Sequence, residues 1–237
     1  MNAEPEPHIF ENTMSGWQTA LGWLYLPVHC ILLPILLGVY VAVSETPVSP
    51  ASVSLVQYAV AWAFVLLVMM SFLREGFDVF LDDPLTGVMG ICCAMVGVWF
   101  LEVGASLLLL PFAGAGENPN NAELLRMGAE EPGKVRALAV FLAPVAEEVL
   151  FRGVVFGSLR PRHKRLAYAV SALLFALNHV WAYALDAGNP WLLLHMIEYI
   201  PVSLGLAWCY DRTGSIWTPI FYHMLVNALS WNALGGG

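Results

Sequence analysis

The sequence predicts an all-α membrane protein, a polytopic bundle of about seven transmembrane helices. Of its 237 residues, 59% are hydrophobic and only 12% are charged, and the mean hydropathy is +0.68. This composition is far more apolar than that of an ordinary soluble domain. The apolar residues also form runs of about 20 or more, the length that crosses a bilayer. We expect roughly six to eight membrane helices in one integral membrane domain over residues 1–237.

Each predicted helix is one apolar run. In order, the runs cover residues 22–43, 51–73, 85–112, 135–159, 166–185, 191–210 and 216–234. Apart from Glu102 in the third, the first three contain no Asp, Glu, Lys or Arg. Each of the last four carries polar or ionisable side chains at membrane depth. We therefore expect the helices with the catalytic motifs to lie within residues 135–234. In the long connection 113–133, the segment ELLRMGAEE is expected to form a short interfacial helix.

Lys and Arg predict the orientation of the bundle. If seven helices alternate, one side collects Arg74, Arg160, Arg162, Lys164, Arg165 and Arg212, and the other collects Arg126, Lys134 and Arg136. The positive-inside rule then places the N-terminus and the 160–165 loop in the cytoplasm. The first twenty residues contain no Lys or Arg, so we expect no cleaved signal peptide.

Charge and motif content exclude several functions. The net charge of −8 and the lack of a basic patch argue against nucleic-acid binding. The four cysteines lie in apolar runs without C-x-x-C spacing, so we interpret them as core residues. Neither the H-E-x-x-H metalloprotease motif nor the G-x-S-x-G nucleophile elbow is present.

Polar side chains of three predicted helices share one depth. Glu147, His179 and Asn227 each lie about 13 to 14 residues from the basic side, roughly 20 Å into the membrane, and His223 lies one turn nearer that side. Glu148 and Arg152 are four residues apart and share a helix face, whereas Glu147 points about 100° away. A carboxylate and an imidazole could therefore activate water, while His223 and Asn227 donate hydrogen bonds to an oxyanion.

Each residue alone has an ordinary structural explanation. Glu–Arg pairs and amides join membrane helices, and a lone buried histidine is more often a core residue than a catalyst. We interpret the pair of His195 and Glu198, and the single Glu102, as structural in this sense. The four polar residues at matching depth favour a functional site instead.

Three ordered motifs resemble those of the CPBP family of CAAX proteases and bacteriocin-processing enzymes, also called ABI, which includes the type II CAAX prenyl endopeptidases. Glu147, Glu148 and Arg152 fit E-E-x-x-x-R. Phe175 and His179 fit F-x-x-x-H, and His223 and Asn227 fit H-x-x-x-N. The resemblance implies an intramembrane endopeptidase without a covalent intermediate.

The resemblance also implies the site. Glu147 and His179 would activate water, His223 and Asn227 would stabilise the oxyanion, and Glu148 with Arg152 would brace the helix, with Phe175 in support. No cofactor is expected. Two histidines and a carboxylate could nevertheless hold zinc, and its ligands would be Glu147, His179 and His223. The expected substrate is a membrane-associated peptide or protein, either prenylated or a bacteriocin or pheromone precursor, at a bacterial plasma membrane.

Two other interpretations stay open. Glu, His and Arg within a helical bundle can form the relay of a proton-coupled transporter, although the sequence shows no paired halves with broken helices. The chain could also bind a peptide without cutting it, as an immunity or scaffold protein. Ion flux that depends on Glu147, or protection that survives its replacement, would favour these interpretations.

Overall fold

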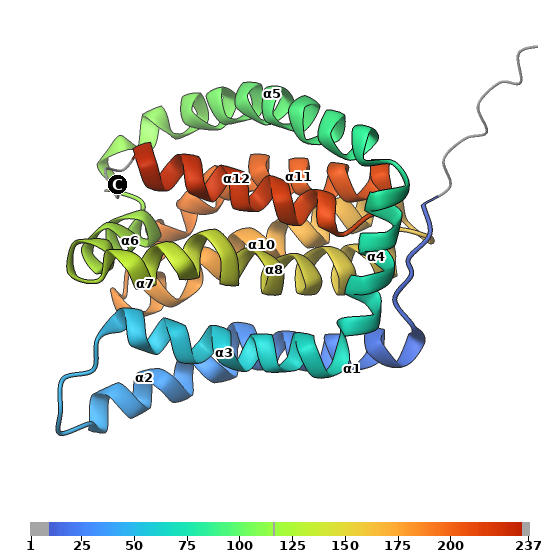
Figure 1. Ribbon diagram of the computed structural model, residues 1–237. Helices are drawn as coiled ribbons and strands as arrows, with labels where there is room; N and C mark the ends of the chain where they lie inside the picture. The colour runs from blue at the N-terminus through green and yellow to red at the C-terminus, as the bar shows by residue number, and fades with distance from the viewer. Residues whose placement is uncertain (1–9, 116, 234–237) are drawn as a thin grey trace, which may run out of the picture.

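The computed structural model describes residues 10–115 and 117–233, which form a bundle of helices without any strand (Figure 1). The elements are α1 (Gly16–Pro27), η1 (Val28–Leu32), α2 (Leu33–Val43), α3 (Pro50–Val68), α4 (Met70–Asp82), α5 (Pro84–Leu109), η2 (Leu110–Ala115), α6 (Pro119–Glu130), α7 (Pro132–Ala137), η3 (Leu138–Leu142), α8 (Ala143–Glu147), η4 (Glu148–Phe156), α9 (Gly157–Leu159), α10 (Lys164–Asp186), η5 (Pro190–His195), α11 (Met196–Thr213) and α12 (Trp217–Ala233). The all-α membrane fold is therefore confirmed.

Five helical segments are long and apolar enough to cross a membrane. They are Gly16–Val43, Pro50–Val68, Pro84–Phe112, Lys164–Asp186 and Pro190–Thr213. The other two predicted runs correspond to α7–α9, which carries the charged motif residues, and to α12, which has 17 residues. The expected number of about seven membrane helices remains a prediction. Residue 234 and the N-terminal residues 1–9 lie outside the described part of the chain.

The predicted helix over 51–73 is divided in the structure. Met69 leaves the helical conformation, with φ −106° and ψ 5°, and α4 begins at Met70. Figure 1 shows α4 running across one end of the bundle, between α3 and α5. This helix carries Arg74, Glu75 and Asp78, whose charges favour the bilayer interface over its apolar interior. The segment 119–130 likewise forms the short α6, as expected for ELLRMGAEE.

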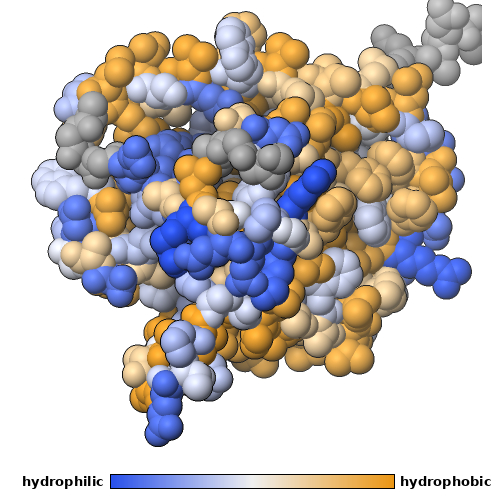
Figure 2. Space-filling model, turned by 60° about the vertical axis from the view of Figure 1, so that its left-hand side comes forward, coloured by the Kyte–Doolittle hydropathy of each residue, from blue (hydrophilic) through white to orange (hydrophobic). Residues whose placement is uncertain are grey.

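Side-chain contacts join the loops at each end of the bundle. Lys164 Nζ lies 2.8 Å from Asp211 Oδ2 on α11, and Ser215 Oγ donates to Gly76 O on α4 at 2.6 Å. The basic loop therefore shares an end with α4 and the end of α11. At the opposite end, Glu131 pairs with Lys134. Hydrophilic residues gather on this second end, which carries α6, and hydrophobic residues flank it (Figure 2).

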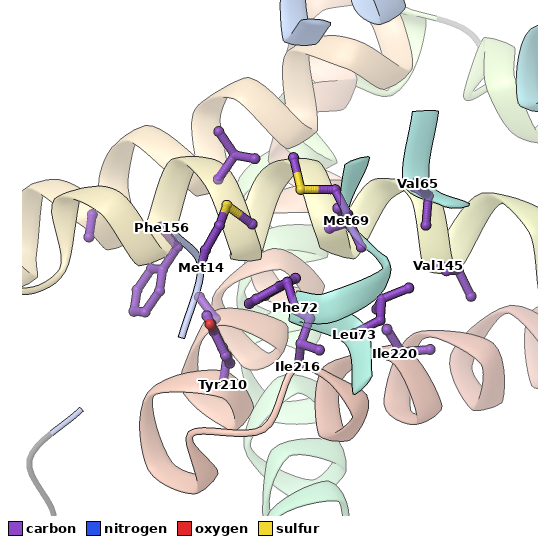
Figure 3. Close-up of a cluster of buried hydrophobic side chains, with 14 of the residues drawn as sticks. Met14, Val65, Met69, Phe72, Leu73, Val145, Phe156, Tyr210, Ile216 and Ile220 are labelled. Carbon is purple, nitrogen blue, oxygen red and sulfur yellow. The ribbon is translucent and has the colours of Figure 1, made fainter. Parts of the chain in front are cut away.

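The helix α7–α9 lies at the centre of the bundle. All residues from 143 to 157 are buried. One core cluster packs α4 against this helix and against the start of α12, with Phe72, Val145 and Ile220 among its members (Figure 3). A Cβ on Gly153 would lie 2.9 Å from Phe72 Cε1, so glycine permits this close approach. The motif residues are thus held by packing from several sides.

The cysteines only partly match their expected core positions. Cys209 is buried and Cys30 is half-buried. Cys92 and Cys93 are exposed on α5, so their interpretation as core residues is wrong. Both lie in a predicted membrane span, where an apolar run can face lipid as readily as protein.

Candidate active site

The helix that carries the two glutamates has wide turns on both sides of α8. Residues 138–142 and 148–156 are π-helical, and Pro144, which has no backbone N–H, lies between them. Such turns inside α-helices are frequent at functional sites because they redirect side chains. Here Glu147 lines a cavity and Glu148 is enclosed by the core.

Glu147 faces side chains from three other helices. Its Oε1 accepts a hydrogen bond of 2.5 Å from the Tyr58 hydroxyl on α3. Its Oε2 lies 4.0 Å from Nε2 of His179 on α10 and 3.8 Å from Nε2 of His223 on α12. One carboxylate oxygen is therefore bound by a phenol, and the other faces two imidazoles.

Hydrogen bonds on the far side of each ring orient the two imidazoles. His179 Nδ1 lies 2.8 Å from the carbonyl oxygen of Phe175, and His223 Nδ1 lies 2.7 Å from Glu148 Oε1. Because a carbonyl oxygen or a carboxylate can only accept, both Nδ1 atoms carry hydrogen. Both Nε2 atoms are then acceptors in the neutral ring, and both face Glu147. A water molecule could donate to these acceptors.

Glu148 connects His223 to a buried cation. The oxygen that accepts from His223 also accepts from Arg152 Nη1 at 3.1 Å. Arg152 Nη2 donates to Ser203 Oγ at 2.8 Å, and the guanidinium stacks on Phe175, 4.4 Å from the ring centroid. The Glu148 and Arg152 side chains are fully buried. The pair expected from i, i+4 spacing is present, and Glu148 additionally orients a histidine.

Asn227 lies one turn beyond His223 on α12. Its Nδ2 donates to the carbonyl oxygen of Ala139 at 2.7 Å, which attaches α12 to the central helix. A side-chain amide carries two N–H donors, so a second remains for another acceptor. Asn227 also lines the cavity. Its expected role as an oxyanion donor stays a prediction.

A cavity of about 630 Å³ brings these groups together. Its lining includes Glu147, Phe175, His179, His223 and Asn227, whereas Glu148 and Arg152 lie behind it. Further polar side chains line it as well, among them Gln57, Asn118, Asn120, Asn121, Asn178 and Ser230. A hollow lined by amides and hydroxyls offers donors and acceptors to a peptide backbone.

The sequence predicts structural roles for the pair of His195 and Glu198 and for Glu102, and the structure confirms only the pair. His195 Nδ1 lies 2.7 Å from Glu198 Oε1, so this pair is present. Glu198 also accepts from Asn118 Nδ2 at 2.5 Å, which connects α11 to the start of α6. Glu102 lines the cavity and forms no hydrogen bond or ion pair within residues 10–115 and 117–233. The interpretation of Glu102 as a structural pair is therefore wrong.

The sequence motifs miss three residues at the site. They are Tyr58, which bonds Glu147; Ser203, which bonds Arg152; and Tyr199, whose ring stacks on His179 at 4.4 Å between centroids. A tyrosine or serine in an apolar run has many structural roles, and no spacing rule joins residues on different helices. Only the three-dimensional arrangement reveals these contacts.

The expected zinc ligands lie slightly farther apart than the ligands of a tetrahedral zinc ion. Ligand atoms on one tetrahedral zinc lie about 3.4 Å apart. Here Glu147 Oε2 is 3.8 Å from His223 Nε2 and 4.0 Å from His179 Nε2. In the described ranges, no three His, Cys, Asp or Glu side chains are grouped closely enough to form a metal site. The expectation that the protein needs no cofactor stays a prediction.

Comparison with known proteins gives a family match to the part of the chain that carries the site. Residues 134–229 match the family model for type II CAAX prenyl endopeptidase Rce1-like proteins. A Bacillus subtilis protein named putative membrane peptidase YdiL is 26% identical over 115 residues, covering 48% of this chain and 43% of that protein. The UPF0177 protein YxdF of Lactococcus lactis subsp. lactis is 31% identical over 93 residues, covering 39% and 46%.

The chain thus spans less than half the length of both curated relatives. No solved structure gives a significant match. All three motifs lie within the matched region, which extends from the start of the central helix to α12. Over residues 134–229, the chain is similar to the type II CAAX prenyl endopeptidase Rce1-like family.

Proposed function

We propose that this protein is an intramembrane endopeptidase that hydrolyses a peptide bond with water activated by Glu147 and His179. The observation that carries the proposal is the meeting of Glu147 Oε2 with the Nε2 atoms of His179 and His223, at 4.0 and 3.8 Å, on the wall of one cavity. The family match and the name of the Bacillus relative support peptidase chemistry.

In the first step, water lies between Glu147 Oε2 and His179 Nε2. As its oxygen attacks the scissile carbonyl carbon, one proton passes to Glu147 and the carbonyl oxygen becomes an oxyanion. His179 orients the water through the bare Nε2 that its bond to Phe175 leaves exposed. Collapse of the tetrahedral intermediate breaks the C–N bond, and Glu147 transfers the proton to the departing amine.

His223 and Asn227 stabilise the oxyanion. A donor at Nε2 of His223 requires the imidazolium, because Nδ1 already donates to Glu148. In that form, His223 supplies a charged hydrogen bond where negative charge develops, and the Glu148 carboxylate lies on the opposite side of the ring as its counter-ion. The second N–H of the Asn227 amide supplies another. Arg152 holds Glu148 in place from behind.

No metal takes part in this scheme. His223 and Asn227 must be free to donate to the oxyanion, and zinc on the imidazole Nε2 would remove one of these donors. We expect activity to persist after dialysis against a chelator. One stoichiometric zinc whose removal abolishes cleavage would contradict this expectation.

The substrate is a membrane-associated peptide or protein whose scissile segment enters the amide-lined cavity. The family name refers to prenylated substrates, and the two relatives come from bacteria, which favours a bacterial plasma membrane as the location. Mass spectrometry of membrane peptides from cells with the active protein and with Glu147→Gln would identify the substrate. Assays of the prenylated and unprenylated forms would then show whether cleavage needs the lipid.

Glu147→Gln tests the base directly. Because glutamine cannot accept the water proton, cleavage should fall by about 10²- to 10⁴-fold while folding is retained. Glu75→Gln is the matched control, since Glu75 is an exposed carboxylate on α4 and should leave cleavage unchanged. Full activity of Glu147→Gln would refute the proposed function. Ion flux into liposomes that depends on Glu147 would instead favour a transporter.

A further inference from the structure

We infer that Tyr58 is a positioning residue for this reaction, which holds the Glu147 carboxylate so that its free oxygen faces the attacking water. The inference rests on the proposed function. Tyr58 lies in the N-terminal half of the chain, on α3, outside the region 134–229 that matches the family model and outside all three motifs. Its hydroxyl nevertheless bonds the proposed base at 2.5 Å.

The reason lies in the other neighbours of Glu147. Both imidazole Nε2 atoms lie 3.8 Å or more from Glu147 Oε2, which is beyond hydrogen-bond distance, so neither donates a hydrogen bond to the carboxylate. Across residues 10–115 and 117–233, Tyr58 is the one side chain that donates a hydrogen bond to Glu147. The terminal torsion of a glutamate is otherwise broad. Without this phenol, the carboxylate would be free to rotate in the cavity.

The Tyr58 hydroxyl also makes the two carboxylate oxygens of Glu147 different from each other. An O–H donor to a carboxylate makes a short, charge-assisted bond, as observed at Oε1. That bond occupies one oxygen and leaves Oε2 directed toward His179 and His223. The water that Glu147 deprotonates must approach this second oxygen. Tyr58 therefore determines from which side of the carboxylate the water is activated.

α3 itself is well anchored for this purpose. Four residues after Tyr58, on the same helix face, Trp62 Nε1 donates to the carbonyl oxygen of Leu142 at 3.0 Å. Two hydrogen bonds thus join one face of α3 to the central helix, one to its backbone and one to Glu147. The ring of His29 packs edge-on against the Tyr58 ring at 5.7 Å between centroids. The phenol is consequently held by its ring as well as by its hydroxyl.

Tyr58→Phe removes only the hydroxyl. Because a small misplacement of a catalytic group is costly, kcat should fall by about 10²-fold with KM nearly unchanged. The assay uses an internally quenched peptide with the cleavage sequence identified by the mass-spectrometric comparison. Tyr25→Phe is the matched control, because the Tyr25 hydroxyl is buried without a hydrogen-bond partner and its ring stacks on Phe64 of α3. It should leave kcat unchanged.

A double-mutant cycle separates positioning from a merely structural role. In Glu147→Asp, the carboxylate is one methylene shorter and no longer reaches the phenol. Adding Tyr58→Phe should then change kcat by less than about two-fold, since coupled residues are not additive. An equal loss in both backgrounds, or an unchanged kcat for Tyr58→Phe alone, would overturn the inference. These outcomes are distinct from failure of the proposed function, which retained activity of Glu147→Gln would reveal.

Discussion

The N-terminal and C-terminal membrane helices differ in what surrounds them. We compare the most apolar 18-residue stretch of each candidate membrane span. The protein buries 11%, 17% and 17% of this stretch in the first three spans, but 33% and 44% in the last two. The central helix is buried continuously from residue 143 to 157. The N-terminal helices thus use their apolar side chains mainly toward lipid, whereas the C-terminal helices use theirs to enclose a polar site.

This difference explains where the family resemblance lies. Residues 134–229 contain the motifs and the helices that bury them. A lipid-facing surface needs only to be apolar, so many sequences satisfy it, whereas a buried hydrogen-bonded site fixes side-chain identity at each position. The N-terminal half still contributes Tyr58, which reaches the site from α3.

The largest effect should come from breaking the buried charge network of the C-terminal half. Glu148→Gln leaves Arg152 buried without its anionic partner, which should cost about 3–5 kcal/mol of unfolding free energy. It also removes the carboxylate that orients His223, so cleavage per folded molecule should fall by about 10- to 100-fold. Unfolding in detergent and peptide cleavage measure the two losses.

A second variant separates these two effects. Glu148→Gln combined with Arg152→Met removes both charges, so much of the lost stability should return because replacing a buried pair by apolar groups is often neutral. Cleavage should stay low, because His223 still lacks its carboxylate partner. Recovery of both properties in the double variant would show that Glu148 serves only to neutralise Arg152.

A pair of identical substitutions compares the two regions directly. Leu150 on the central helix is 1% exposed and Leu67 on α3 is 84% exposed. Leu150→Ala should cost about 2–5 kcal/mol of unfolding free energy because it leaves a cavity in the core. Leu67→Ala should change it by less than about 0.5 kcal/mol. Similar losses at the two positions would mean that α3 is covered by protein rather than by lipid.

The smallest expected loss of unfolding free energy comes from replacing a serine whose hydroxyl accepts a hydrogen bond, and one such serine in each region is compared. Ser203→Ala removes the hydroxyl that accepts from Arg152, and should cost about 1.5 kcal/mol because the donor is charged and buried. Ser71 accepts from Gln18 Nε2 at 3.0 Å in the N-terminal half and is exposed. Ser71→Ala should cost less than about 0.5 kcal/mol. Equal values in thermal unfolding would contradict the contrast between the regions.

Local spacing predicts contacts within one helix and fails between helices. The i, i+4 rule identifies Glu148 with Arg152, and the i, i+3 rule identifies His195 with Glu198. It cannot find the bond between Glu148 and His223, which joins residues 75 positions apart. Glu102 shows a different error, because the sequence predicts a structural pair and the structure places this carboxylate beside the cavity. A single acidic residue in an apolar run looks the same in the sequence in both cases.

The depth of a residue in the membrane can be predicted from sequence because membrane helices rise uniformly. At a constant rise per residue, equal distances from one loop mean equal depth, which places Glu147, His179 and Asn227 in one layer. Depth says nothing about rotation around each helix axis. The packing of the bundle determines how each helix is rotated, and it turns all three residues toward one cavity.

The sequence by itself determined the fold class, the motif-bearing helices and the grouping of polar residues at one depth, because hydropathy and helical periodicity are local properties of the chain. Tertiary structure alone decided which atoms meet. It placed the Tyr58 hydroxyl on Glu147 and Glu148 on the far side of the His223 ring. Such contacts depend on how helices rotate and pack against one another, and that arrangement results from burial over the whole bundle rather than from any single segment.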